Sequence, residues 1–249
     1  TAQTTFRSIK VRGLGQLTIA SVDVPSLTVL EPVQLSTSGR MEIGPGVVFT
    51  VSNGLGFDFD VASGSVLDLD GSSTLAADTL RVNGGTVNAG IDLSYPNGGD
   101  FQVAGGGTFN ILPGTVTTVG FFDETNIQSG TVSIASDARL NILSNTARVG
   151  NSPAIVTLVK DGYLGPGPGQ ADSIASLTVQ SGGVVTHTGY AGQVSPPLPR
   201  GLVLNVTGTL TVQTGGSIDV TGKGLRGASN GSPFWNSGEA FNASDQIVA

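Results

Sequence analysis

Four aspartates lie in two short segments where carboxylates alternate with apolar residues. They are Asp58 and Asp60 in Phe-Asp-Phe-Asp-Val, and Asp68 and Asp70 in Leu-Asp-Leu-Asp-Gly. Because successive side chains of a strand point to opposite faces, this pattern predicts the apolar residues inside and all four aspartates outside. Two carboxyls about 5–9.5 Å apart are what glycoside hydrolysis requires, and clustered carboxylate oxygens are what Ca²⁺ prefers. We favour a third interpretation, a solvated strand face whose charges discourage aggregation.

The two aspartate segments do not match a known calcium loop. An EF-hand loop needs glycine at its sixth position, whereas Gly71 is fourth in the segment that starts at Asp68. The glycine-rich nonapeptide of calcium-binding β-rolls is missing as well. Calcium therefore stays a candidate ligand only through these aspartates, and we expect no other cofactor.

The single histidine and the absence of cysteine limit the other chemistries. His187 alone cannot supply the four nitrogen or sulfur ligands of a structural zinc site. It would have to be the base of any Ser-His-Asp mechanism, but the chain has no Gly-x-Ser-x-Gly elbow. We therefore expect His187 to lie at the end of a strand, and we expect no catalytic residues and no enzymatic activity.

Aromatic residues offer an apolar face with a polar edge, which suits contact with sugars or with a docking partner. Four of them, Tyr163, Tyr190, Phe234 and Trp235, lie in irregular stretches of the sequence rather than in predicted strands. We expect these four to provide glycan or docking contacts. The alternative is that such rings cover the ends of the hydrophobic core.

The composition excludes several classes of protein. Of 249 residues, 38 are glycine and only 12% are charged, against usual shares of about 7% and about 25%. A disordered chain would be charge-rich and poor in apolar residues, and no apolar run is long enough for a membrane-spanning helix. The net charge is −7 and the basic residues are scattered, which argues against nucleic acid as a partner.

Short runs of alternating apolar and polar residues predict an all-β protein. The runs are rich in β-branched residues, and glycine or Asn, Asp and Ser close most of them. Residues 78–87, 100–109, 176–185 and 209–218 share an apolar-x-Val strand, a Gly-Gly pair and a second strand. Such a repeat indicates a parallel β-helix, or β-solenoid, of roughly eleven coils of about 22 residues each. The alternative is a β-sandwich or jelly roll.

The repeat also predicts how the chain is organised. We expect a single elongated domain over residues 1–249, in which 1–24 is a candidate cap, 186–201 an inserted loop and 223–249 a glycine-rich tail or junction. The predicted core stacks one coil on the next and comprises Phe57, Phe59, Leu67, Leu69, Leu80, Val82, Phe101, Val103, Leu210 and Val212.

Residues 176–187 and 201–224 resemble the glycine-rich repeats of very large bacterial exoproteins, with their Leu-Thr-Val-Gln and Gly-Gly steps. Those repeats are similar to the β-helical passengers of autotransporter adhesins and filamentous haemagglutinins. The resemblance implies a secreted protein at the cell surface, used as an adhesin body, stalk or filament subunit, and it implies no catalytic residues. We expect self-association end to end or continuation in a longer chain, contact with polysaccharide or a cell surface, and no membrane insertion. The alternative is a β-helical polysaccharide lyase or hydrolase, or a glycan-binding module.

Overall fold

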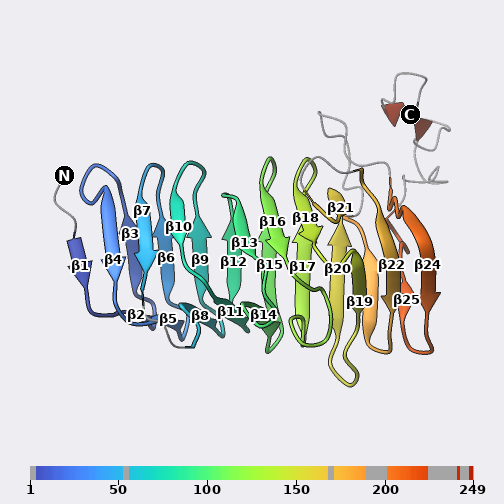
Figure 1. The fold of residues 1–249 in the computed structure, drawn as a ribbon, viewed down its shortest axis with the longest axis horizontal. Helices are drawn as coiled ribbons and strands as arrows, with labels where there is room; N and C mark the ends of the chain where they lie inside the picture. Colours follow the sequence, from blue (N-terminus) through green and yellow to red (C-terminus); the bar gives the residue numbers. More distant parts are fainter. Residues whose placement is uncertain are drawn as a thin grey trace, which may run out of the picture.

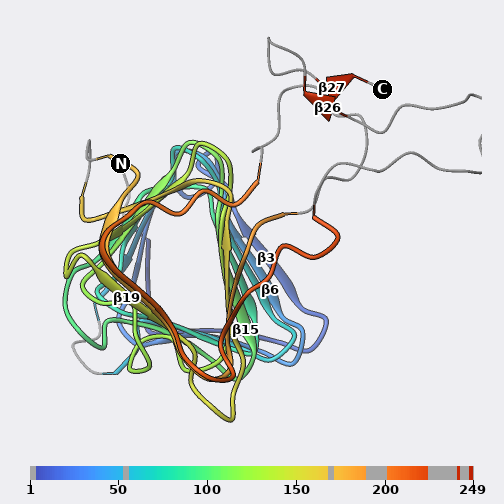
Figure 2. The ribbon, with the colours of Figure 1, turned by 90° about the vertical axis from the view of Figure 1, so that its right-hand side faces the viewer.

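The chain winds into a parallel β-solenoid with three faces (Figures 1 and 2). The computed structural model describes residues 4–52, 56–167, 171–188 and 201–223, and the backbone of two short strands at 240–241 and 247–248. Strands of successive coils pair in parallel, as at Leu80↔Phe101 and Val82↔Val103. The β-helix prediction is confirmed and the sandwich alternative is wrong. Within the described part, no helix is long and apolar enough to cross a membrane.

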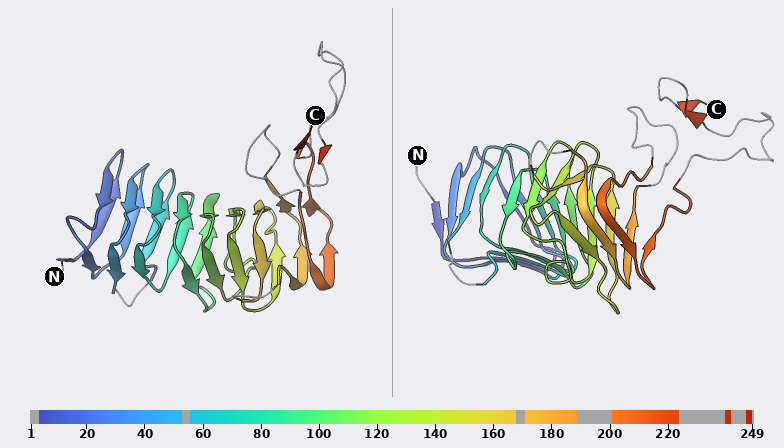
Figure 3. Two further views of the ribbon diagram at one scale, coloured as in Figure 1. Left: turned by 90° about the horizontal axis from the view of Figure 1, so that it is seen from above. Right: turned by 45° about the vertical axis from the view of Figure 1, so that its right-hand side comes forward.

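Each coil contributes one strand to each face in turn, and Figure 3 shows the coils stacked along the long axis. The first face contains two four-stranded sheets, made of β1 (Thr4–Phe6), β4 (Ser26–Val29), β7 (Val48–Val51) and β10 (Thr74–Ala76), then of β13 (Leu93–Tyr95), β16 (Val116–Val119), β18 (Arg139–Ile142) and β21 (Tyr163–Gly165). The second face contains a five-stranded and a three-stranded sheet, made of β2 (Ile9–Arg12), β5 (Val33–Ser36), β8 (Phe59–Ala62), β11 (Leu80–Asn83) and β14 (Phe101–Ala104), then of β19 (Thr146–Val149), β22 (Ile174–Val179) and β24 (Val206–Val212).

The third face is one continuous sheet of nine strands, namely β3 (Gln16–Ile19), β6 (Arg40–Ile43), β9 (Val66–Leu69), β12 (Thr86–Ala89), β15 (Gly107–Ile111), β17 (Gly130–Ile134), β20 (Val156–Lys160), β23 (Gly183–Thr186) and β25 (Ser217–Ile218). The described part therefore has fewer coils than the eleven expected. The reason is that most coils are longer than the sequence repeat predicts, as the starts of β17, β20, β23 and β25 show. The strands β26 (Ala240–Phe241) and β27 (Ile247–Val248) form a separate antiparallel pair.

Most of the predicted core lies inside the solenoid. The buried members are Phe59, Leu67, Leu69, Leu80, Val82, Phe101 and Val103. Phe57 is an exception because it precedes β8 and lies outside, where the guanidinium of Arg81 covers its ring at 4.9 Å. Leu210 and Val212 pair with the buried Leu177 and Val179 but are 47% and 48% exposed, at the end of the described stack.

The Gly-Gly pairs occupy the corner before the third face, and their two glycines serve different purposes. Gly106 has a positive φ of 77°, which residues other than glycine rarely adopt. Gly107 has no room for a side chain, because a Cβ there would lie 2.6 Å from the carbonyl oxygen of Val82 in the preceding coil. The first glycine of the pair turns the chain, and the second lets two coils approach closely.

We expect Gly107→Ala to lower the free energy of unfolding by about 3 kcal/mol, because the backbone of one coil must move away from the next. Gly106→Ala is the matched control. Nothing lies within 4 Å of a Cβ at Gly106, so only the left-handed backbone is penalised, by about 1 kcal/mol. Urea denaturation of both variants measures the difference, and equal losses would contradict the close-approach explanation.

The predicted segments are only partly described. Residues 4–19 form β1, β2 and β3, which pair with the second coil as later coils pair with one another. Whether 1–24 acts as a cap stays a prediction. Residues 189–200 of the predicted loop, and most of 223–249, lie outside the described residues.

Candidate functional site

The first face is interrupted between its two sheets. β10 is the last strand of one sheet and β13 the first strand of the next, so their facing edges are not hydrogen-bonded to each other. Their first residues, Thr74 and Leu93, are closer in sequence than those of any other two successive strands of this face. The other two faces stay paired at this level, through β11 with β14 and β12 with β15. The interruption is therefore local to one face.

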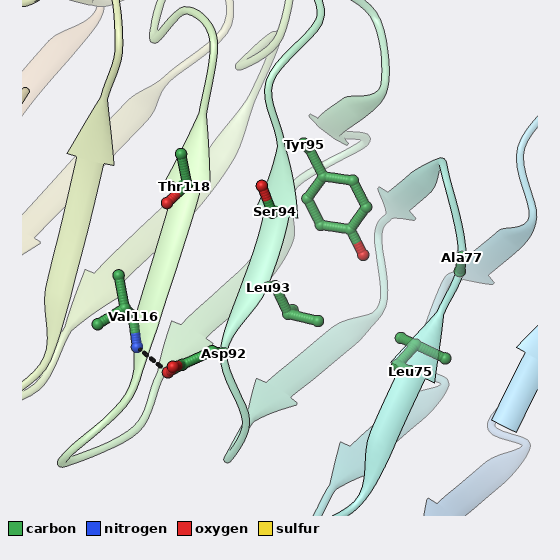
Figure 4. Close-up of a pocket in the computed structure, with 8 residues that line it drawn as sticks. All are labelled: Leu75, Ala77, Asp92, Leu93, Ser94, Tyr95, Val116 and Thr118. Atoms are coloured by element: carbon green, nitrogen blue, oxygen red, sulfur yellow. Dashed lines mark hydrogen bonds between the residues drawn. The ribbon is translucent and has the colours of Figure 1, made fainter. Parts of the chain in front are cut away.

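A groove of about 390 Å³ lies at this interruption (Figure 4). Its wall on the β10 side is apolar, and the β13 side adds hydroxyls and one carboxylate; the lining residues are Leu75, Ala77, Asp92, Leu93, Ser94, Tyr95, Val116 and Thr118. A second hollow shares Leu75 and Asp92 and extends toward Ser72 and Thr115. The volume is within the range of about 300–1,000 Å³ that is usual for ligand pockets.

Tyr95 is the largest buried side chain at the groove. Its ring stacks on Phe101 with a centroid distance of 5.7 Å, and Figure 4 shows its hydroxyl pointing away from β13 toward the β10 side. The residue is only 1% exposed, and its hydroxyl has no hydrogen-bond partner in the structure. Burial and, to a smaller extent, the charge of Asp58 raise the pKa of Tyr95, so the hydroxyl is a neutral donor at pH 7.

Backbone groups of both bordering strands also point into the groove. Thr74 donates its N–H to Val47 of the preceding coil. Because backbone groups of successive residues in a parallel strand point to opposite sides, those of Leu75 point to the groove. On the other side, Gly120 donates to the carbonyl of Tyr95, which leaves the backbone groups of Ser94 pointing to the groove.

The four aspartates do not form a common patch. Asp60 lies on the second face, in a bidentate ion pair with Arg81 at 2.7 and 3.0 Å. Asp68 lies on the third face, 2.6 Å from Arg40. Asp70 accepts a hydrogen bond from the backbone of Gly71 in a turn.

Asp58 contradicts the prediction that all four aspartates point outward. It is 4% exposed and its Oδ2 accepts hydrogen bonds from the backbone N–H groups of Asp78 and Thr79. Burial raises the pKa of Asp58, although these two hydrogen bonds oppose the increase. Because Asp58 comes before β8, its side chain is set by the corner rather than by strand alternation.

Among the described residues, no group of three or more His, Asp or Glu side chains lies close enough to hold a metal ion. Asp58, Asp60, Asp68 and Asp70 occupy a corner, two different faces and a turn. The structure thus does not bring together the carboxylates on which the calcium candidate depends. Each carboxylate instead has a structural partner in its own coil or a neighbouring one.

Of the aromatic candidates, only Tyr163 is described. It begins β21 instead of lying in an irregular stretch, it is 44% exposed, and the guanidinium of Arg139 lies 5.1 Å from its ring centre. Tyr190, Phe234 and Trp235 lie outside the described residues. His187 follows β23 and is 5% exposed, as expected for a histidine at the end of a strand.

The groove residues were not among the predicted site residues. Leu75, Leu93 and Tyr95 alternate with polar neighbours as every other strand does. The one signal in the sequence is the short spacing of the two strands. The groove contains one carboxylate, Asp92, and neither a histidine nor a cation among its lining residues, so it is suited to binding and lacks the groups for acid–base catalysis.

No family model matches the chain, and no curated protein or solved structure matches it significantly.

Proposed function

We propose that the chain is a structural, adhesive β-solenoid segment of an extracellular bacterial surface protein or filament, which continues into further coils or stacks end to end. The observation that carries the proposal is the exposed end of the hydrophobic column. Leu210, Val212, Ile218 and Val220 are 36–48% exposed, whereas Leu177, Val179 and Val185, one coil earlier, are buried. A further parallel coil would cover these side chains and pair the free edge of the last strands.

The first coil offers a related surface at the opposite end of the solenoid (Figure 1). Phe6 pairs with the buried Val29 but is itself 48% exposed. Because all coils wind in the same direction, the first coil of one copy can continue the parallel sheets of another. The resemblance to exoprotein repeats supports the same proposal, since those chains are built from stacked coils.

Light scattering over a wide range of protein concentrations tests the end-to-end contact. We expect the mass of the full chain to increase with concentration, and Leu210→Glu to abolish that increase by placing a charge in the column. Thr211→Glu, on the outer side of the same strand, is the control and should still associate. A full chain that stays monomeric at every concentration would overturn the proposed stacking.

The alternative function, a polysaccharide lyase or hydrolase, has a separate test. Incubation with neutral and uronic-acid polysaccharides should release neither reducing ends nor unsaturated uronides. Release that Asp60→Asn or Asp68→Asn abolishes would overturn the structural interpretation in favour of an enzyme.

A further inference from the structure

We infer that the groove between β10 and β13 binds an extended polypeptide strand of another protein. The bound strand would lie parallel to both edges, exchange main-chain hydrogen bonds with Leu75 and Ser94, and present a lysine or arginine to Asp92. This inference concerns the side of the solenoid and does not depend on stacking at its ends.

The two facing edges are the first reason. The backbone groups of Leu75 and of Ser94 point into the groove from opposite sides, and the strand order places no neighbouring strand between them. Strand edges with free main-chain groups recognise extended peptides by adding a strand. An oligosaccharide could not satisfy two edges with the regular alternation of donors and acceptors that a peptide backbone supplies.

The hydroxyl of Tyr95 is the second reason. It is a buried donor without a partner, and Figure 4 shows it between the two edges. A buried polar group without a hydrogen bond is unfavourable. A carbonyl oxygen of an inserted strand would accept this hydrogen bond, and Leu75 and Leu93 would contact an apolar side chain of the same strand.

Charge is the third reason, and it selects the kind of peptide. Asp92 is the only charged residue that lines the groove, and its Oδ1 already accepts a hydrogen bond from Val116 at 2.7 Å. The side chain is exposed, so its second oxygen can meet a cation. The whole chain has a net charge of −7. A basic peptide therefore complements the groove, whereas an acidic peptide or a uronic-acid polysaccharide would be repelled.

The experiment titrates a fluorescent, acetylated and amidated peptide, in which valine and threonine alternate around a central lysine, into the full chain. We expect saturable binding that Ser94→Pro weakens by about tenfold or more, because proline removes one edge donor. Proline is tolerated on edge strands, and circular dichroism checks that the fold persists. Ser94→Ala is the matched control, since it keeps the backbone N–H and should bind as the original chain does.

Two further arms test the other contacts. Asp92→Asn keeps the acceptor for Val116 but removes the charge, so it should reduce the preference for the lysine peptide over its glutamate counterpart. Tyr95→Phe should weaken binding without lowering the melting temperature. The inference is overturned if the peptide does not bind, if Ser94→Pro binds it as well as Ser94→Ala does, or if neutral oligosaccharides compete for the groove and the peptide does not.

Discussion

Phe101→Asp is expected to unfold the solenoid, or to lower its free energy of unfolding by about 4 kcal/mol or more. Phe101 is 1% exposed, and its ring lies between Tyr95 at 5.7 Å and Phe109 at 4.8 Å. An aspartate at this position would be buried among aromatic rings without a cation to pair with. The coils on either side stack on the same column, so the loss affects the whole stack. Urea denaturation followed by circular dichroism measures it.

Gln102→Asp is the control, because it introduces the same side chain one residue further along β14. Gln102 points outward and is in register with Arg81, which already pairs with Asp60. We expect its effect on stability to stay within about 0.5 kcal/mol. If the two aspartates had equal effects, the alternation of inward and outward residues along β14 would be wrong.

That alternation is the part of the fold that was predictable from sequence. A strand buried on one face must repeat every two residues, so Phe59, Leu67, Val82 and Phe101 were correctly placed inside. The Gly-Gly pairs were informative for a similar reason. Each marks a corner where one residue needs a positive φ and the next has no space for a Cβ, and no other residue pair meets both needs.

The wrong predictions have local physical causes. Phe57 and Asp58 continue the alternation of β8 in the sequence, but the strand begins only at Phe59, and the corner before it reverses their placement. Leu210 and Val212 point into the column as predicted, yet burial also requires a following coil. The groove was not predicted because it depends on how two coils fail to meet on one face, which the alternation within β10 and β13 does not encode.

Lys160 is a further residue that the sequence pattern does not explain. It lies on β20 in register with the buried Ile134, which places its side chain among apolar residues, and it is 4% exposed. Its Nζ is 2.9 Å from Oδ2 of Asp172 and 3.0 Å from the carbonyl oxygen of Gly162. The other carboxylate oxygen of Asp172 accepts a hydrogen bond from the backbone of Leu164. The ion pair thus fixes the segment before β22 to the neighbouring coil.

Asp172→Ala is expected to cost about 3–5 kcal/mol of stability, because it leaves the ammonium group of Lys160 buried without a counter-ion. The double variant Lys160→Met, Asp172→Asn removes both charges, keeps the apolar length of the lysine side chain and keeps an acceptor for Leu164. Replacing a buried ion pair by apolar groups is often neutral or stabilising, so the double variant should recover most or all of the loss. Urea denaturation of the three proteins decides. A double variant as unstable as Asp172→Ala would show that the ion pair itself, and not the uncompensated charge, accounts for the loss.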